Sequence, residues 1–274
     1  MLRLIGTEMS KQIRRPRTWV ALGFVVIVPI IIAVALKLNP PDLSDGGRAD
    51  GPRYFYLATQ SGLFLPVAAL RVMAGFFLVV VICMFAGDAV ASEAGWGNLR
   101  YILVRPVSRG RLLTAKLLVA AVFALFATFL VAFSGLIAGV VAFGADPINV
   151  PLAGLSQSTG DILVNLGLST VLITWGLAGI IAFGFMLSTM TDASAGAIFG
   201  AVGLYIVSLI LGEITSLGAI RYGLPVHYYD AWSDLFVRNQ FTDDMWRSIL
   251  LQIPYVIVFG SIAWWTFHRK DIKS

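Results

Sequence analysis

The first uncharged stretch of this chain is TWVALGFVVIVPIIIAVAL, residues 18–36, and it decides the class of the fold. About 20 helical residues cross the ~30 Å hydrocarbon core of a bilayer, so this stretch is long enough to form a membrane span. Arg14, Arg15 and Arg17 precede it as they would in a signal peptide, but the apolar core of a cleavable signal is only about 7–15 residues long. The stretch ends at KLNPP, residues 37–41, which is no small-residue cleavage site, so we expect the span to be retained.

Further apolar stretches follow the first one, with charged residues gathered between them. Only 13% of the 274 residues are charged and 58% are hydrophobic, whereas a soluble domain carries about 25% charged residues. Because a charge in hydrocarbon costs kilocalories, this pattern indicates segments solvated by lipid. The further stretches are residues 63–91, 117–144, 162–191, 193–212 and 248–267. The sequence therefore predicts a single all-α integral membrane domain, residues 1–274, with six transmembrane helices and a tight hairpin between the fourth and the fifth.

The placement of Lys and Arg predicts the orientation, because cytoplasmic loops carry an excess of both residue types. With the N-terminus inside, the cytoplasmic segments are residues 1–17, 88–116, 190–193 and 268–274. These segments hold 13 of the 20 Lys and Arg residues but only five of the 15 acids. We therefore expect both termini in the cytoplasm and a multi-pass protein of the cytoplasmic membrane.

The segments outside the spans differ in kind. Residues 1–17 place Leu2, Ile5, Met9 and Ile13 at helical spacing, which predicts an amphipathic interfacial helix on the inner leaflet; a plain basic flank of the first span is the alternative. Residues 37–62 are rich in Pro, Gly and Asp, so we expect an irregular outer loop. Residues 213–247 carry many aromatic side chains, as short helices resting on the outer surface do.

The predicted inner loop between the second and third spans has a structure of its own. Leu99, Ile102 and Leu103 form one apolar face of a short helix, and Arg105 precedes a proline, which favours a helix end. Ser108 then stands where the N-cap of the third span would lie. From charge alone, these are ordinary positive-inside residues; the alternative is a short helix that a cytoplasmic partner pushes.

Residues 93–116 read EAGWGNLRYILVRPVSRGRLLTAK. This stretch resembles the cytoplasmic loop of ABC-2 type transporter permeases. The resemblance rests on the acid at 93, the Gly-x-Leu run from residue 97, the Arg-Pro-Val-Ser-Arg run of 105–109, and the Leu and Lys residues that enter the third span. Asn98 stands where that family often has Thr. Residues 224–232, LPVHYYDAW, resemble the segment before the sixth span of that family, and size and topology agree along the chain.

The resemblance implies the transmembrane permease subunit of an ATP-binding cassette exporter in the cytoplasmic membrane of a bacterial or archaeal cell. Its partners would be two copies of a cytoplasmic ATPase, a second permease copy (identical or different) and the lipid bilayer, and no nucleic acid. The loop helix would be a coupling helix that docks on the ATPase. Carried over position by position, the coupling residues would be Glu93, Gly97, Leu99, Arg100, Arg105, Pro106 and Arg109.

The chain contains no Gly-x-x-x-x-Gly-Lys-Ser/Thr loop for cradling ATP phosphates. We therefore expect no enzymatic activity and no cofactor in this chain, with ATP and Mg²⁺ on the partner ATPase. The spans are apolar throughout, which favours a hydrophobic or amphipathic substrate.

Arg71 is a charge inside an otherwise apolar stretch, about 25 Å from Asp88 along a helix. It is either a cation on the translocation path or an arginine that snorkels to the outer headgroups, and we favour the second interpretation. Asp88 fits the inner boundary of the span better than a proton relay. Gly135-x-x-x-Gly139 and Gly196-x-x-x-Gly200 allow close helix approach, either within the chain or at a dimer face.

Three other classes of function remain as alternatives. An intramembrane serine protease of the rhomboid kind needs Gly-x-Ser-Gly, but residues 132–135 read AFSG and both histidines, His227 and His268, lie outside the apolar core. A secondary transporter would show broken helices or paired ionisable residues near the midplane. A sensor or scaffold of the same topology would differ from the permease by having no ATPase partner.

Overall fold

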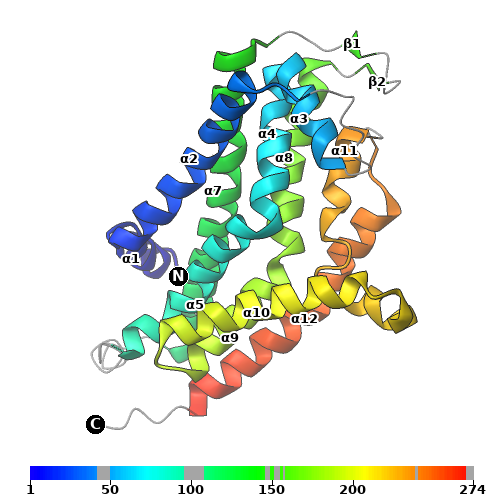
Figure 1. The fold of residues 1–274 in the computed structure, drawn as a ribbon. Coiled ribbons are helices and arrows are strands. Elements are labelled where there is room, and N and C mark those ends of the chain that lie inside the picture. The colour runs from blue at the N-terminus through cyan, green and yellow to red at the C-terminus, as the bar shows by residue number, and fades with distance from the viewer. Residues whose placement is uncertain are drawn as a thin grey trace.

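A computed structural model describes residues 1–41, 50–95, 108–145, 149–150, 155–156, 158–237 and 240–269. These residues form a helical bundle with one antiparallel pair of two-residue strands (Figure 1). The first part of the chain consists of α1 (Leu2–Ile13), α2 (Pro16–Leu38), α3 (Asp50–Gln60), η2 (Gly62–Phe64), α4 (Leu65–Val72), η3 (Met73–Phe77), α5 (Leu78–Gly95) and α7 (Arg109–Phe143). The second part consists of β1 (Asn149–Val150), β2 (Leu155–Ser156), α8 (Thr159–Gly176), α9 (Ala178–Met190), α10 (Ser194–Glu213), η5 (Thr215–Gly223), η6 (Tyr229–Ser233), α11 (Asp234–Val237) and α12 (Asp243–Arg269).

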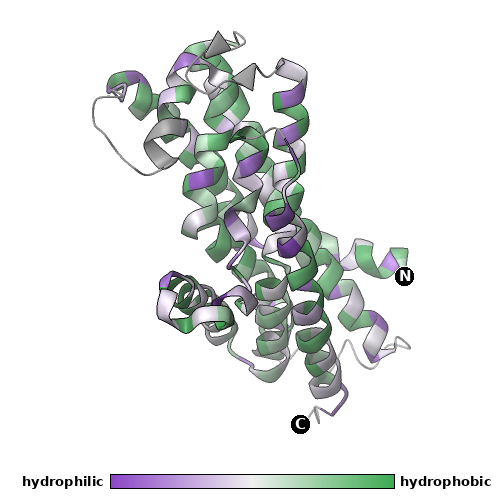
Figure 2. Cartoon of the chain, turned by 90° about the vertical axis from the view of Figure 1, so that its right-hand side faces the viewer, coloured by the Kyte–Doolittle hydropathy of each residue, from purple (hydrophilic) through white to green (hydrophobic). Residues whose placement is uncertain are grey.

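Five of the described helical segments are long and apolar enough to cross a membrane, and a sixth span results if α8 and α9 are counted as one. The segments are 16–38, 62–94, 109–143, 194–213 and 243–269, and each contains one of the predicted stretches or nearly all of it. Large apolar side chains are exposed on the helix surfaces, for example Val20, Ile31 and Val141. The long helices are coloured mainly as hydrophobic in Figure 2. A water-facing bundle would carry polar side chains on these surfaces, so this distribution fits a membrane-embedded protein.

The ends of the helices lie on two opposite sides of the bundle. In Figure 1, α1, the end of α5 and the end of α12 lie at the lower left, whereas α3, the two strands and α11 lie at the upper right. Between these sides, α5 packs against α7, α9 and α10, and α12 packs against α9. The bundle therefore places the N-terminal helix and the residues that flank the loop at 96–107 on one side.

The hairpin between α9 and α10 is as tight as predicted, since only residues 191–193 separate the two helices. The predicted single fourth span is bent instead, with 42° between α8 and α9. At the bend, the side-chain Oε1 of Gln252 accepts a hydrogen bond from the backbone N–H of Gly179, and the indole N–H of Trp175 donates to the carbonyl of Ile249. A side chain that satisfies a backbone group in this way permits a sharp bend.

The expectation of an irregular loop over residues 37–62 is wrong in part, because α3 lies within it. Tyr54 and Ala58 are one helical turn apart, and both are buried against the bundle. Their apolar face is short and surrounded by Gly, Pro and Asp, so the composition concealed it. The pair of strands β1 and β2 is a second small departure from the all-α expectation.

The second and third spans cross at glycine residues. The backbone N–H of Gly62 donates to the carbonyl of Gly144, and a Cβ at Gly62 would overlap the carbonyl of Gly139. Gly135 packs in the same way against Pro66. The Gly135-x-x-x-Gly139 motif therefore serves contact within the chain, as small residues in membrane helices commonly do.

Candidate functional site

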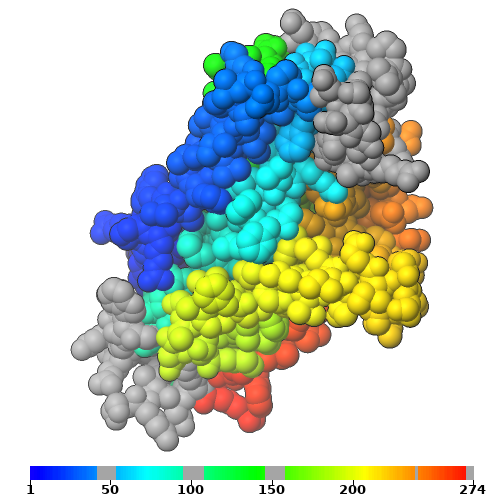
Figure 3. Space-filling model, viewed as in Figure 1, coloured from blue at the N-terminus to red at the C-terminus, as the bar shows by residue number. Residues whose placement is uncertain are grey.

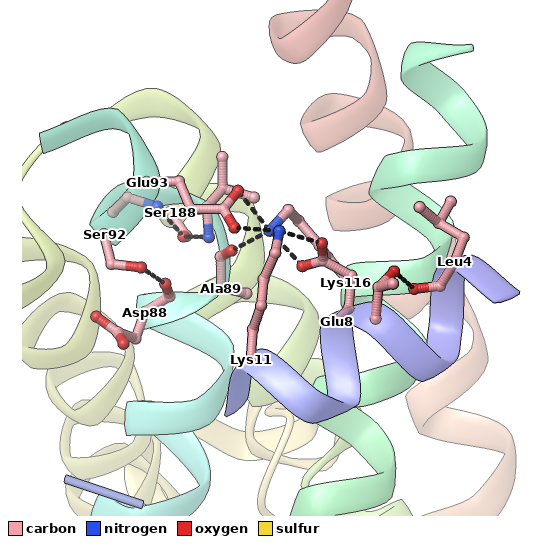
Figure 4. Close-up of polar contacts among 12 residues, drawn as sticks. Leu4, Glu8, Lys11, Asp88, Ala89, Ser92, Glu93, Lys116 and Ser188 are labelled. Atoms are coloured by element: carbon pink, nitrogen blue, oxygen red, sulfur yellow. Dashed lines mark hydrogen bonds and ion pairs between the residues drawn. The ribbon is translucent and has the colours of Figure 1, made fainter. Parts of the chain in front are cut away.

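Four charged side chains from three helices form a closed ring at the lower-left side of the bundle (Figure 4). The ring consists of Glu8 and Lys11 of α1, Glu93 of α5 and Lys116 of α7. Each carboxylate contacts both ammonium groups. The Nζ–Oε distances are 2.6 Å for Lys11–Glu8, 3.1 Å for Lys11–Glu93, 2.7 Å for Lys116–Glu8 and 2.6 Å for Lys116–Glu93. Two acids and two bases leave the ring without net charge.

The ring is mostly buried. The Lys116 side chain is 2% exposed and those of Glu8 and Glu93 are 7% exposed, whereas Lys11 is 42% exposed. Buried Lys and Glu are rare in proteins unless they are paired, because removing a charge from water is costly. Lys116 Nζ also donates to the carbonyl of Ala89 at 3.1 Å. Its contact with Glu93 Oε2 lacks hydrogen-bond geometry and is an ion pair only.

The ring holds Glu8 and Lys11 in their charged forms. Burial alone would raise the pKa of Glu8, but the positive charges of Lys116 and Lys11 and the hydrogen bonds from both outweigh burial and lower it. Burial alone would lower the pKa of Lys11, but its contacts with Glu8 and Glu93 outweigh burial and raise it. Docking of α1 on the bundle is therefore strongest at pH values at which both Glu8 and Lys11 are charged.

A second ion-pair cluster joins the α1–α2 junction to α5. Asp88, with a side chain only 3% exposed, contacts Nη1 of Arg15 at 2.6 Å and Nη1 of Arg17 at 2.9 Å. Asp88 therefore has arginine partners that the sequence did not indicate, and its place at the inner boundary stays a prediction. Together with the ring, this cluster fastens the second half of α1 and the α1–α2 junction to the last turns of α5.

The end of α5 is also attached to α9. The hydroxyl oxygen of Ser188 accepts hydrogen bonds from the backbone N–H groups of Val90 and Ala91, both at 2.9 Å (Figure 4). The Ser92 hydroxyl donates to the carbonyl of Asp88. A cavity of about 20 Å³ lies beside the ring, bounded by Gln12 and Phe123 among others, and has room for about one water molecule. The site is therefore a structural junction and is too small to hold a substrate.

The residues predicted to couple the chain to an ATPase fall into two groups. Glu93 is a member of the ring, and Arg109 begins α7 and donates from Nη1 to the carbonyl of His268 at 3.0 Å. Trp264 packs on Gly110, so the start of α7 also contacts α12. The positions Gly97, Leu99, Arg100, Arg105 and Pro106 lie outside the described residues. The described residues on either side of positions 96–107 are thus anchored in the bundle.

Arg71 lies nine residues after the start of the second span, in the half of the span away from the ring. Its Nη1 is 2.7 Å from Oδ1 of Asp230 in η6, with side chains 29% and 62% exposed. Neither interpretation from the sequence included this partner. Close by, η3 is a turn of π-helix, whose carbonyls at Ala74 and Gly75 accept hydrogen bonds from the hydroxyl of Tyr205, and that of Ala74 also from Tyr229. Such π-turns are uncommon and occur often at functional sites.

Sequence reasoning missed the ring because its members looked like positive-inside flanks. Glu8 follows Leu4 and Ile5 by one helical turn, which places an acid on the face that those apolar residues share. Lys116 lies in the third turn of an apolar helix, beyond the usual flank. An acid on an apolar face and a base inside an apolar helix could have indicated buried ion pairs. Nothing in the sequence, however, shows that these two residues contact each other.

Comparison with known proteins gives two matches. The family description that matches residues 54–273 is Protein of unknown function (DUF2705). The Uncharacterized protein YhcI of Bacillus subtilis (strain 168) is 24% identical over 221 residues, which cover 76% of this chain and 67% of that protein. The family match includes Glu93 and Lys116 of the ring and begins after α1 and α2.

Proposed function

We propose, from the premise that the chain belongs to the family described as Protein of unknown function (DUF2705), that it is the transmembrane permease subunit of an ATP-driven exporter. In this proposal the loop at 96–107 docks on a separate cytoplasmic ATPase, two copies of which serve a pair of permease chains. Six spans with both termini in the cytoplasm complete the arrangement. The motif-like sequence of residues 93–116 supports the partner, and the anchoring of that loop supports the coupling.

The observation that carries the proposal is the buried ring at the base of the loop. Glu93 lies three residues before position 96, and Lys116 lies in the third turn of the helix that follows the loop. Their ion pair joins the two helices that enter and leave the loop, and Glu8 and Lys11 add α1 to the same junction. A force on the loop would move α1, α5 and α7 together, because separating one member exposes an unpaired buried charge.

The second span gives this movement a route to the opposite side. Its inner end carries Asp88 and Glu93, and its outer half carries the π-turn and Arg71. Tyr229 and Asp230 attach the outer segment, residues 214–237, to that half. Displacement of α5 at the ring would therefore shift the outer segment as well. The apolar lining of the spans suits a hydrophobic or amphipathic substrate.

Co-purification tests the proposal. The full chain, extracted from its own host's membranes, is expected to bring down a cytoplasmic protein with a phosphate-binding P-loop, and deletion of residues 94–110 is expected to release it. Arg105→Ala with Pro106→Gly should abolish ATP-dependent transport and the stimulation of ATP hydrolysis. Arg111→Ala is the matched control, since Arg111 is exposed on the first turn of α7 and outside the proposed coupling set.

Two outcomes would overturn the proposal. One is a full chain that never associates with an ATPase, which would favour the sensor or scaffold class. The other is a complex in which the Arg105 and Pro106 changes leave transport and stimulated hydrolysis at the level of the Arg111 control.

A further inference from the structure

The surface of α1 has an unusual distribution of side chains. Its protein-facing side carries Leu4 and Ile5 beside the buried charged Glu8, whereas Leu2 (85% exposed), Met9 and Ile13 are turned outward. A helix on the surface of a soluble bundle would carry polar side chains on its outward side. The outward side of α1 therefore fits a hydrocarbon boundary and not bulk water.

The charges on the outward side are all of one sign. Glu8 is the only acid in residues 1–17, and the ring conceals it. Arg3 and Arg14 are exposed, and in the part of the chain that the structure describes neither forms an ion pair. An apolar strip bordered by unpaired arginines is complementary to an anionic phospholipid surface, which offers acyl chains and phosphates together.

The same surface continues along α2. Trp19 is 62% exposed, and its indole N–H donates to the carbonyl of Ile13 at the end of α1. Beyond it, Ile27 and Ile31 of α2 are exposed on a helix long enough to span a membrane. Figure 3 shows α1 and α2 as one continuous ridge on that face. Because this ridge runs from α1 onto a span, its occupant is the lipid leaflet and not an acidic protein surface.

We propose that α1 is a binding element for anionic phospholipid, whose outward face engages the leaflet while its inward face closes the charge ring. Lipid binding and ring closure act on the same short helix, so each favours the other. An anionic leaflet therefore keeps α1 docked on α5 and α7, and a zwitterionic leaflet leaves α1 held by the ring alone. The proposal concerns the chain by itself and does not depend on transport or on an ATPase.

Hydrogen exchange of the full chain in nanodiscs tests this inference. Backbone amides of residues 2–13 are expected to exchange more slowly in discs of phosphatidylcholine with phosphatidylglycerol than in phosphatidylcholine alone. Each arginine near an anionic surface contributes about a fivefold factor, so two give up to about twenty-fivefold slower exchange. Arg3→Gln with Arg14→Gln should remove most of the difference, and high salt should reduce it. Lys37→Gln, at the other end of α2, should retain it.

The nanodiscs contain no ATPase, so the results concern lipid binding alone. Equal exchange in the two kinds of disc would overturn the inference, and so would a lipid effect that the two arginine changes leave intact. Equal protection by inorganic phosphate added to phosphatidylcholine discs would assign a free-anion site instead of a lipid surface. None of these results bears on whether an ATPase binds the loop at 96–107.

Discussion

Two regions of the second span are fixed by different chemistry. At its inner end, buried ion pairs hold it: Glu93 and Lys116 are buried, and each is paired with α1. In its outer half, neutral hydroxyl groups of Tyr205 and Tyr229 satisfy the carbonyls of a π-turn, and the ion pair there is partly exposed. Loss of one member from the inner end leaves a buried charge unpaired, whereas loss of one hydroxyl leaves only a neutral carbonyl.

This difference suggests a division of roles along one helix. A junction of buried ion pairs is costly to separate, so the parts that it joins move as a unit. A cluster of single hydrogen bonds and a partly exposed ion pair is cheaper to open, and regions that move are drawn from such places. We therefore expect the inner junction to be rigid and the outer one to yield more easily.

The largest effect is expected from Lys116→Met. It leaves Glu8 and Glu93 with Lys11 as their shared cation, and breaking a buried pair from one side costs about 3–5 kcal/mol. Thermal unfolding of the purified chain in detergent measures the loss. Adding Glu8→Gln restores charge balance and should recover part of the stability. The matched control is Lys37→Met, an exposed lysine, which should change stability by less than about 0.5 kcal/mol.

A pH outside the range in which Glu8 and Lys11 are charged should weaken the docking of α1, with a smaller effect than Lys116→Met. The pKa of Glu8 is lowered by folding, so its contribution is present above its ordinary value of 4.5 and is lost as the pH falls through the lowered value. The pKa of Lys11 is raised, so its contribution is present below 10.5 and is lost as the pH rises through the raised value. The mobility of a spin label at Ser10→Cys should be constant between these limits and increase outside them. A steady change across neutral pH would contradict this assignment.

In the outer half of the span, Tyr205→Phe combined with Tyr229→Phe should lower the free energy of unfolding by about 1–2 kcal/mol. Both substitutions keep the aromatic side chain that packs in the core, and together they leave the Ala74 and Gly75 carbonyls without their hydroxyl donors. Thermal unfolding again gives the magnitude. Each single change should cost less than the pair, because the Ala74 carbonyl receives a hydrogen bond from both tyrosines. A loss as large as that of Lys116→Met would reverse the ranking of the two regions.

The smallest effect is expected from Asp230→Asn. With one partner largely exposed, the Arg71–Asp230 pair should contribute less than about 1 kcal/mol. The free energy of local opening, measured by hydrogen exchange of residues 229–237, is expected to fall by more than the free energy of global unfolding. The reason is that the ion pair restrains this segment and not the whole bundle. Unchanged exchange there would mean that the pair does not restrain the outer segment.

The sequence predicted most of the helical segments but not the contacts that join them. Uninterrupted apolar runs fix where the spans lie, and Ser108 marks the start of α7 as expected. The bend between α8 and α9 could not be predicted from the local sequence, because the side chain that satisfies a backbone group there, Gln252, is more than 70 residues away. Helix α3 was missed because its buried face contains only a few residues.

The candidate site was only partly predictable for the same reason. Glu93 and Arg109 were expected on the basis of the loop, and both occupy anchoring positions. The partners of Glu93 come from helices 82 residues before it and 23 residues after it in the chain, and charge counting assigned both to topology. Periodicity describes one helix at a time, so it cannot pair an acid on α5 with bases on α1 and α7.

The most direct test of the central claim asks whether the ring transmits a force from the loop. Hydrogen exchange of residues 2–13 would be measured in the complex with the captured ATPase, with and without ATP, for the wild type and for Glu8→Gln with Lys116→Met. ATP is expected to change exchange in α1 of the wild type, and the double variant, which keeps only the Lys11–Glu93 pair of the ring, should bind the ATPase while showing a much smaller change. An equal response of α1 in the two proteins would contradict the claim that the ring couples the loop to the bundle.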